Sequence, residues 1–365
     1  MQRVIVNGAN GYVASHFINE LLVNGYKVVA LVRETSNTTS EQRMKKTLTD
    51  INAQVDFKNL EVYNYSLLKK NFSLNSQQLA EIFRDDADFF HFAASLKFKS
   101  RDKEEIFKTN VDGTENSLKV FKNNATTSSR FFYISTAYSC GKTSEPFKED
   151  FYRNEGIEHF RNYYEQSKRY AENQVKKYIE SKKLNAHIIR LSQVVGNNKS
   201  GVTKTNYGIF DFIQKMQKFS ARFPNEKIRV KINPDATQNL IPIDNVVDYL
   251  MELLNKKEIP VIFNFVGRNA VSNNEIARIV NTMLPVEVVQ EQELEKKDLN
   301  KLERMIASGM SFTGVYTNTD LQFDTKNLEK TVSLNGNEIT RESLHRMIEY
   351  FLKQNLKKAE EKVSP

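Results

Sequence analysis

The stretch that decides how this chain folds is Val4-Ile-Val-Asn-Gly-Ala-Asn-Gly-Tyr-Val-Ala14. A short β-branched run ends in two glycines, Gly8 and Gly11, and an amphipathic segment follows at once. This order predicts a strand, a tight turn and a helix, the layout of a dinucleotide-binding crossover. Two glycines alone also fit a strand, turn and helix that bind no ligand, so the interpretation depends on the rest of the chain.

The residues of this turn have distinct expected roles. Gly8 is expected to allow the sharp turn, and Gly11 to let the backbone approach a pyrophosphate. The helix that follows would point free N–H groups and the positive end of its dipole at that anion. We therefore expect Gly8, Asn10, Gly11, Tyr12 and Val13 to hold the pyrophosphate end of a dinucleotide.

Strand-like and helix-like segments alternate through the first half of the chain. Strands are expected over 2–7, 27–32, 59–64, 87–92, 130–135 and 185–191, and helices over 11–24, 76–84, 101–123 and 160–183. Such alternation predicts an α/β fold with a doubly wound, mostly parallel sheet and helices on both faces. Ligands of such sheets bind beyond the carboxyl ends of the strands.

The second half of the chain has a less regular pattern. A helical piece lies near 209–219, the apolar run 261–265 reads as a further strand, and the pattern is helical from 272 on. We expect a dinucleotide-binding Rossmann domain over 1–192 and a smaller, mainly substrate-binding α/β domain over 193–365. Residues from about 241 to 266 are expected to return to the first domain.

Tyr164 and Lys168 form a pair whose spacing suits acid–base chemistry. Four residues apart on a helix, both side chains lie on one face. A nearby ammonium favours the phenolate and so lowers the pKa of the tyrosine, which prepares it as a general acid or base for a carbonyl or alcohol oxygen. Other Tyr-x-x-x-Lys pairs occur here, but only this one opens a long helix after a strand that ends in hydroxyls.

That strand ends in Ser135 and Thr136. We expect the Thr136 hydroxyl to hydrogen-bond a substrate oxygen together with Tyr164. The alternative is that these hydroxyls only cap the end of the strand.

The end of the second predicted strand bears on the choice of nicotinamide cofactor. Proteins that bind NAD place Asp or Glu there to hold the ribose 2′-OH, whereas an arginine suits the 2′-phosphate of NADP. The strand ends in Arg33 and Glu34, and Arg33 offers a planar, permanently charged guanidinium. We therefore favour NADP(H) over NAD(H), with a solvated Arg33 and a ribose-binding Glu34 as the alternative.

Together these motifs resemble the extended short-chain dehydrogenase/reductase family. Its motifs are matched by Asn7-Gly-Ala-Asn-Gly-Tyr-Val-Ala14, His91-Phe-Ala-Ala94, Asn110-Val-Asp-Gly-Thr114, Arg190-Leu-Ser-Gln-Val-Val-Gly196 and Ile241-Pro-Ile-Asp-Asn-Val246. The resemblance implies that Thr136, Tyr164 and Lys168 are catalytic and that Tyr164 and Lys168 also contact the cofactor. It further implies cofactor contacts at Ala93, Ala94, Gln193 and Val194, the last two beside the nicotinamide.

Within that family the chain looks most like the fatty-acyl and thioester reductase branch. The similar segments are Asn71-Phe-Ser-Leu-Asn75, Ala93-Ala-Ser-Leu-Lys-Phe98, Ile134-Ser-Thr-Ala-Tyr138 and Tyr164-Glu-Gln-Ser-Lys168 with Ala171-Glu172. One departure is Asn64-Tyr65, which stands where the family often has Gly-Asp, the Asp meeting the adenine.

The resemblance implies an NADP(H)-dependent oxidoreductase that reduces a small-molecule carbonyl or acyl thioester. One alternative is an NAD-dependent nucleotide-sugar epimerase or dehydratase, and another is a cofactor-binding regulator without turnover. A homodimer through helices 101–123 and 160–183 would be usual for the family.

Composition excludes several other classes. The 365 residues carry a formal net charge of +8, but charges of both signs are interleaved without a basic, aromatic stripe, so no nucleic-acid partner is expected. The single cysteine, Cys140, excludes an internal disulfide, and no residue cluster has metal-ligand spacing, so no metal is predicted. We expect a cytoplasmic protein, because no apolar run approaches the ~20 residues of a membrane span and no signal peptide precedes the first strand.

Overall fold

The computed structural model describes residues 3–309, 314, 316–334 and 338–363. The chain divides into two compact units. The first comprises Met1–Leu191, Val246–Phe265 and Phe323–Ser333, and the second comprises Ser192–Asn245, Val266–Gln322 and Leu334–Pro365. Each unit is therefore assembled from three separate stretches of sequence.

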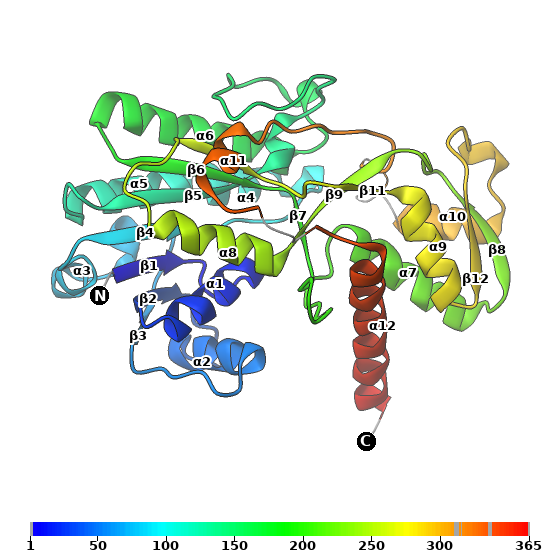
Figure 1. Ribbon diagram of the computed structural model, residues 1–365, viewed down its shortest axis with the longest axis horizontal. Helices are drawn as coiled ribbons and strands as arrows, with labels where there is room; N and C mark the ends of the chain where they lie inside the picture. Colours follow the sequence, from blue (N-terminus) through cyan, green and yellow to red (C-terminus); the bar gives the residue numbers. More distant parts are fainter. Residues whose placement is uncertain (1–2, 310–313, 315, 335–337, 364–365) are drawn as a thin grey trace. The chain divides into compact units, whose positions relative to one another are not determined.

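The first unit contains a seven-stranded parallel sheet with the strand order β10-β6-β5-β4-β1-β2-β3 (Figure 1). The strands are β1 (Arg3–Asn7), β2 (Lys27–Val32), β3 (Leu60–Asn64), β4 (Ala87–His91), β5 (Arg130–Thr136), β6 (Ala186–Leu191) and β10 (Ile262–Phe265). From β1 the strand order continues through β2 to β3, and from β4 it continues in the opposite direction through β5 and β6 to β10. The switch point of this doubly wound fold therefore lies between β1 and β4. The predicted fold class and the predicted strands are confirmed.

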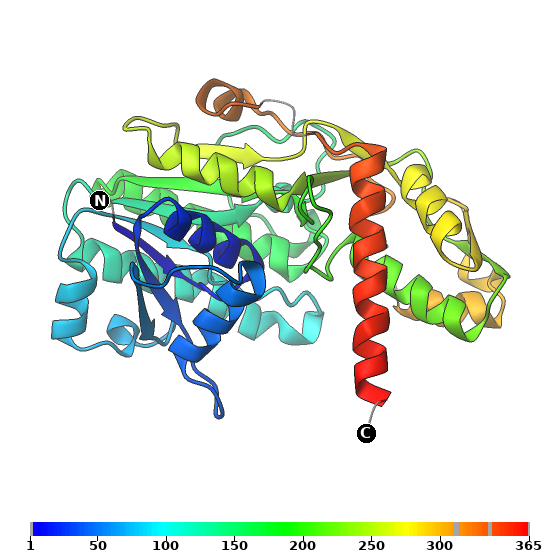
Figure 2. The same cartoon turned by 60° about the horizontal axis from the view of Figure 1, so that its bottom comes forward.

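Helices cover both faces of this sheet (Figures 1 and 2). One face carries α1 (Tyr12–Val23), α2 (Ser40–Ile51) and α8 (Ile243–Leu254), and the other carries α3 (Ser76–Ile82), α4 (Lys103–Phe107), α5 (Gly113–Asn124) and α6 (Tyr163–Lys182), with α11 (Lys326–Thr331) beside β10. The helix predicted over 101–123 is not uniform, because a π turn over Lys108–Asp112 separates α4 from α5.

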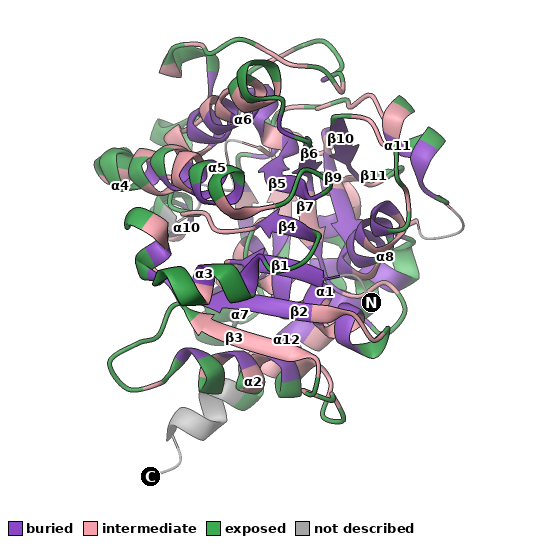
Figure 3. Ribbon diagram, turned by 90° about the vertical axis from the view of Figure 1, so that its left-hand side faces the viewer, coloured by how far each residue is buried: buried purple, intermediate pink, exposed green. Residues whose placement is uncertain are grey.

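Aromatic side chains fill the space between the sheet and its helices. Phe89 stacks on Phe131 with ring centroids 5.3 Å apart, and on the other face Phe90 stacks on Phe132 at 4.4 Å. Each such buried ring contributes about 1.5–3 kcal/mol by leaving water. Figure 3 shows the central strands fully buried, whereas β3, at the edge, is only half-buried.

A left-handed turn follows β3. Asn71, Phe72 and Ser73 all have positive φ, at 53°, 59° and 63°, although none of them is glycine. The Phe72 side chain is fully buried, and the Phe72 carbonyl oxygen accepts a hydrogen bond from the Ser66 N–H at 2.8 Å. Burial of this ring therefore offsets the cost of a conformation that L-residues avoid.

Ser73→Gly should raise the free energy of unfolding by about 0.5–1 kcal/mol, since glycine adopts positive φ without strain and the Ser73 side chain is exposed. Urea denaturation measures the change. Ser36→Gly, at an exposed position without positive φ, is the matched control and should give no gain. An equal effect of both substitutions would contradict the strain argument.

The second unit holds two small sheets. One has the order β11-β9-β7 and the other pairs β12 with β8. The strands are β7 (Gln193–Val195), β8 (Glu226–Val230), β9 (Thr237–Pro242), β11 (Ala270–Ser272) and β12 (Val286–Gln290), and the helices are α7 (Ile209–Arg222), α9 (Asn273–Met283), α10 (Lys301–Gly309) and α12 (Arg341–Val363). The helical pattern predicted from 272 on is wrong at β12, where Val286 and Val288 face the core and Glu287 faces solvent, the period of a strand.

The core of the second unit is built on one face of α7. Phe210, Phe212, Met216 and Phe219 are buried there together with residues of α9 and α12. Among the described residues, no helix combines the length and the apolar character that crossing a bilayer requires.

Candidate active site

The glycine turn lies at the carboxyl end of β1, beside the carboxyl end of its neighbour β4. Gly8 has φ +63°, and a Cβ placed on it would lie 2.7 Å from the backbone nitrogen of Ala93. The Gly11 N–H donates to the Gly8 carbonyl oxygen at 2.9 Å, which closes the turn. Glycine is therefore required at position 8, both for backbone conformation and for the approach of the loop after β4.

Helix α1 begins at this turn with its amino end uncapped by a side chain. Gly11 is its N-cap residue, and the first helical bond runs from the Ser15 N–H to the Gly11 carbonyl oxygen at 2.9 Å. The backbone of Tyr12 and Val13 forms the positive end of the helix dipole. This arrangement fits a pyrophosphate, which such helix ends bind.

Asn10 connects the turn to α2. Its side-chain Nδ2 donates to Thr47 Oγ1 at 3.0 Å, and its Oδ1 is buried without a hydrogen-bond partner among the described residues. The structure therefore gives the Asn10 side chain a contact with α2 in addition to its place in the glycine turn.

A buried network joins the ends of β1 and β4. Asn7 Nδ2 lies 2.7 Å from His91 Nδ1, and Thr114 Oγ1 lies 3.2 Å from His91 Nε2. Asn7 Oδ1 accepts from the Ala93 N–H at 3.1 Å. Burial lowers the pKa of His91 to about 3, so the ring is neutral and serves to hold the Ala93 backbone against the glycine turn.

Tyr164 and Lys168 lie on the first turns of α6. The Asn162 side chain caps this helix by accepting from the Glu165 N–H at 3.0 Å. Lys168 is 3% exposed, and its Nζ donates to the Ile134 carbonyl oxygen of β5 at 2.6 Å and lies 4.3 Å from the Tyr133 ring centroid. Tyr164 is half-buried, one turn earlier on the helix.

Burial lowers the pKa of Lys168 to about 7, and the nearby Glu172 carboxylate opposes this shift. The ammonium of Lys168 is thus held in a poorly solvated place beside the end of β5. Tyr164 and Lys168, four residues apart on α6, present a phenol and an ammonium on one face of the helix.

Thr136 is the last residue of β5. Its hydroxyl donates to the Leu191 carbonyl oxygen at 3.3 Å and accepts from the Tyr138 N–H at 3.3 Å. The side chain therefore caps the turn after the strand, the alternative role expected for it. To bond a substrate oxygen, the hydroxyl must redirect its proton away from Leu191.

A buried ion pair fixes the backbone on both sides of Thr136. Glu172 binds Arg190, with 2.7 Å between Glu172 Oε2 and Arg190 Nη2. Glu172 Oε1 also accepts from Ser135 Oγ at 2.5 Å and from Ser139 Oγ at 2.8 Å. The Ser135 hydroxyl is therefore occupied by the Glu172 carboxylate, which leaves the Thr136 hydroxyl for a substrate at the end of the strand. The sequence showed Glu172 only as part of the Ala171-Glu172 motif, without this role.

Asn110 connects the loop after β4 to α6. Its side chain accepts from the Ser95 N–H at 2.7 Å and donates to the Ser95 carbonyl oxygen at 3.1 Å and to Ser167 Oγ at 2.9 Å. The π turn places Asn110 in this buried position, as π turns often do at functional sites. Ala93 and Ala94, half-buried, belong to the loop that it holds.

Arg33 and Glu34 are exposed just after β2. The Glu34 N–H donates to Asn64 Oδ1 at 3.2 Å, and the Arg43 guanidinium donates to the Arg33 carbonyl oxygen. Two arginines thus lie close together at this corner. Arg43 was missed because α2 was not predicted, and the only signal was a second arginine ten residues after the first.

Gln193 and Val194 belong to the second unit, in β7, which follows β6 along the chain. In the part of the chain that the structure describes, Gln193 Nε2 is buried without a hydrogen-bond partner. The Gln193 amide fills the space that a Cβ at Gly208 would occupy. An unpaired buried donor of this kind is suited to a ligand acceptor.

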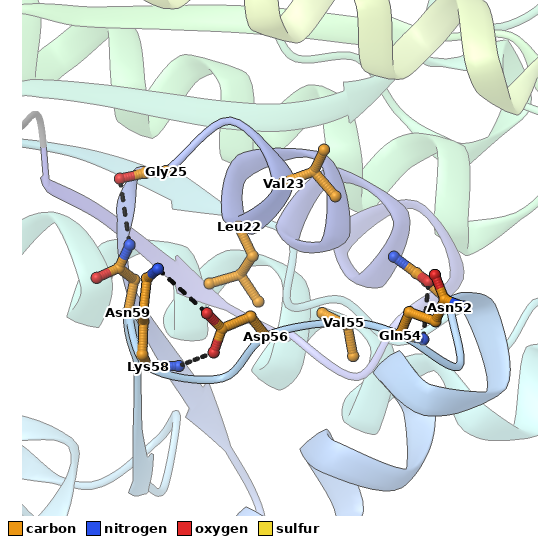
Figure 4. A pocket seen from close by; sticks show the side chains of 9 residues that line it. All are labelled: Leu22, Val23, Gly25, Asn52, Gln54, Val55, Asp56, Lys58 and Asn59. Atoms are coloured by element: carbon orange, nitrogen blue, oxygen red, sulfur yellow. Dashed lines mark hydrogen bonds and ion pairs between the residues drawn. The ribbon is translucent and has the colours of Figure 1, made fainter.

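A separate cavity of about 250 Å³ lies at the end of the sheet opposite to the glycine turn (Figure 4). Leu22 and Val23 from the end of α1 line it together with the loop before β3, where Lys58 and Asp56 form an ion pair of 3.2 Å. This loop and Gly25 precede β3 and β2, so the cavity lies at the amino ends of the strands and is not part of the candidate site.

The parallel sheet, the glycine turn and the Tyr164–Lys168 pair define the class, an NAD(P)-binding extended short-chain dehydrogenase/reductase fold. The sequence profile of the male sterility protein family matches residues 6–250. The chain belongs to this family, which confirms the expected resemblance to extended short-chain dehydrogenases/reductases and makes it a member of a family of NAD(P)-dependent oxidoreductases.

One similar curated protein is the decarboxylating sterol-4-alpha-carboxylate 3-dehydrogenase of Dictyostelium discoideum. It is 31% identical over 138 residues, which cover 37% of this chain and 36% of that protein. The match thus spans about a third of the relative's length.

Three solved structures share the fold along most of the chain. The terminal R domain of the myxalamid PKS-NRPS biosynthetic pathway has a TM-score of 0.78 at 17% identity, covering 98% of this chain and 92% of that chain. A thiolation-reductase di-domain from an archaeal non-ribosomal peptide synthetase has a TM-score of 0.73 at 18% identity, covering 97% of this chain and 76% of that chain. UDP-glucuronic acid 4-epimerase from Bacillus cereus, in complex with NAD, has a TM-score of 0.67 at 16% identity, covering 98% of both chains.

Proposed function

We propose that this protein reduces a carbonyl or acyl-thioester substrate with NADP(H). The observation that carries the proposal is the placement of the glycine turn of β1, the Thr136 hydroxyl of β5 and the Tyr164–Lys168 face of α6 at the carboxyl side of one parallel sheet. The first unit would bind the dinucleotide, and the second would supply most of the substrate contacts.

The bound dinucleotide would supply the hydride. Thr136 would hydrogen-bond the substrate oxygen, and Tyr164 would deliver a proton to it as negative charge develops. Lys168 would hold the nicotinamide ribose and favour the tyrosinate that remains. With a thioester, addition gives a hemithioacetal, which collapses to an aldehyde and a thiol.

Arg33 and Arg43 would bind the 2′-phosphate of NADP(H). Arg33 and Arg43 form a close pair after β2, and guanidinium groups suit a phosphate through charge-assisted hydrogen bonds. The exposed Glu34 has its backbone, not its carboxylate, fixed by Asn64.

Fluorescence titration should show tighter binding of NADPH than of NADH. Arg33→Ala or Arg43→Ala should weaken NADPH binding by about 10- to 150-fold and leave NADH unchanged, since each removes a charge-assisted contact worth roughly 1.5–3 kcal/mol. Arg84→Ala, at the amino edge of the sheet before β4, is the control and should change neither. Equal affinity for the two cofactors in the unsubstituted protein would overturn the NADP(H) assignment.

An NAD-dependent epimerase or dehydratase is the second candidate, supported by the fold likeness to an epimerase in complex with NAD. Such an enzyme keeps its NAD and regenerates it in each turnover. Mass analysis of nucleotide released from the denatured, freshly purified protein separates the two candidates. Stoichiometric NAD supports the epimerase class, whereas its absence together with NADPH consumption supports the reductase.

A further inference from the structure

Tyr133 lies on β5, the strand that ends in Thr136, and its ring faces the helix that carries Lys168. The Lys168 Nζ lies over this ring, 4.3 Å from its centroid. The next residue of the strand, Ile134, accepts a hydrogen bond from the same Nζ at 2.6 Å through its carbonyl oxygen. A cation this close to an aromatic ring is attracted by the negative potential of the ring face. Two successive residues of β5 therefore hold the Lys168 ammonium, one by its ring and one by its backbone.

Packing fixes the Tyr133 ring in this place. The side chain is fully buried in a core cluster that also contains Ala171 and Val175 of α6. On the neighbouring strand β4, the His91 ring stacks on it with ring centroids 5.7 Å apart and an interplanar angle of 27°. The ring is thus held from the helix and from the sheet, so its contact with the Lys168 ammonium has a defined geometry.

The ionisable groups around Lys168 leave an electrostatic role for the ring. On α6, the Glu172 carboxylate attracts the ammonium, but this carboxylate is already paired with Arg190. On β4, burial lowers the pKa of His91 to about 3, so the imidazole adds no positive charge at neutral pH. On β5, burial raises the pKa of Tyr133 itself, so its hydroxyl keeps its proton. The ring face therefore acts on the ammonium as a neutral, permanent source of attraction.

Tyr164 completes the groups on this side of the sheet. It lies one turn before Lys168 on the same face of α6, and it is the phenol on which the ammonium would act. The ammonium favours the tyrosinate only while it is protonated, and burial lowers the pKa of Lys168 to about 7. An attractive ring face favours the charged form of the lysine and so opposes this effect of burial.

We propose that Tyr133 is a positioning residue for Lys168: the face of its ring holds the ammonium near the end of β5 and keeps it charged at the pH at which the enzyme works. The proposal rests on the function proposed above and adds to it a fully buried residue that acts only through Lys168. Because the ring face carries the effect, a phenylalanine at position 133 would serve as well, whereas an aliphatic side chain would not.

The test is a pH titration of Lys168 by NMR on protein with isotope-labelled lysine side chains, in which the Lys168 signal is identified by its absence from Lys168→Met. Tyr133→Leu should weaken proton binding at Lys168 by about 2- to 30-fold, the range that a cation–π contact supplies, and so lower its pKa. Tyr133→Phe keeps the ring face and should leave the titration unchanged. Phe131→Leu is the matched control and should also leave it unchanged, because Phe131 is a fully buried ring on the same face of β5.

A second variant separates the charge distribution of the ring from its shape. Pentafluorophenylalanine incorporated at position 133 keeps a ring in the core and removes the negative potential of its face. Proton binding at Lys168 should be weaker in this protein than in Tyr133→Phe, and the comparison stays decisive if Tyr133→Leu does not fold. In turnover assays with NADPH, the alkaline limb of the pH profile should move to lower pH in the same proteins and by the same factor.

An unchanged or raised pKa of Lys168 in the fluorinated protein would overturn the proposal. An equal fall in Phe131→Leu would overturn it too, because it would show a general disturbance of the core. Absence of NADPH binding and turnover in the unsubstituted protein would instead overturn the proposed function. The titration needs neither cofactor nor substrate, so the two failures are distinguishable.

Discussion

Tyr164→Phe should lower turnover by about 10²- to 10⁴-fold while NADPH affinity is retained, because the substitution removes only the proton that the substrate oxygen receives. Without that proton, negative charge on the oxygen has no acid to neutralise it. The half-buried ring stays in place, since phenylalanine keeps its shape. Turnover is followed by NADPH absorbance with aldehydes, ketones and acyl thioesters, and affinity by fluorescence titration.

Tyr163→Phe is the control for this substitution. Tyr163 is the neighbouring tyrosine on α6, and its ring contacts Phe107 and the Lys103 ammonium. The Tyr163→Phe variant should turn over substrate at nearly the rate of the unsubstituted protein. Full activity in Tyr164→Phe would place the acid elsewhere, and NADPH binding without turnover of any substrate class in the unsubstituted protein would favour a regulator.

The sheet of the first unit was predictable because its strands are short apolar runs bounded by polar turns. Fully buried parallel strands such as β1 and β4 need such runs, and the chain supplies them. Helix α2 was missed, since only Met44 and Leu48 of its apolar residues are fully buried and polar residues surround them. The strands of the second unit were missed because their alternation of apolar and polar residues is short and includes charged side chains.

The candidate site was predictable only where function depends on local spacing. The Tyr164–Lys168 pair lies on one helix and the Gly8–Gly11 turn joins two consecutive elements, so the spacing of both is visible in the sequence. Contacts between elements, such as Gly8 with Tyr65, join residues 57 positions apart and depend on the order of strands. Spacing along the chain carries no trace of such contacts.

The buried Lys168 ammonium makes stability depend on pH in a defined direction. Its pKa is about 7 in the folded protein and near 10.5 when unfolded, so below pH 7 both states carry the proton and the cost of burial is fully present. As pH rises from 7 toward 10.5, only the folded state loses the proton, and the free energy of unfolding rises by up to about 1.4 kcal/mol per pH unit.

Lys168→Met should therefore be more stable than the unsubstituted protein at pH 6.5, by roughly 1–4 kcal/mol, although it loses turnover. Urea denaturation at several pH values from 6.5 to 9 measures this difference, which should shrink as pH rises. Comparing the two proteins removes the opposite effect of Cys140, whose pKa burial raises to about 12 and which lowers stability above pH 9.

Lys177→Met, at an exposed position of the same helix, is the control and should show no pH-dependent difference. A pH-independent difference for Lys168→Met would mean that the Lys168 ammonium is solvated or fully compensated by Glu172. The cost of burying this ammonium would then be absent, and with it the electrostatic reason for expecting Lys168 to act on Tyr164. A difference that shrinks with rising pH would instead show that the fold gives up stability to keep a charge beside the end of β5, which a purely structural lysine does not require.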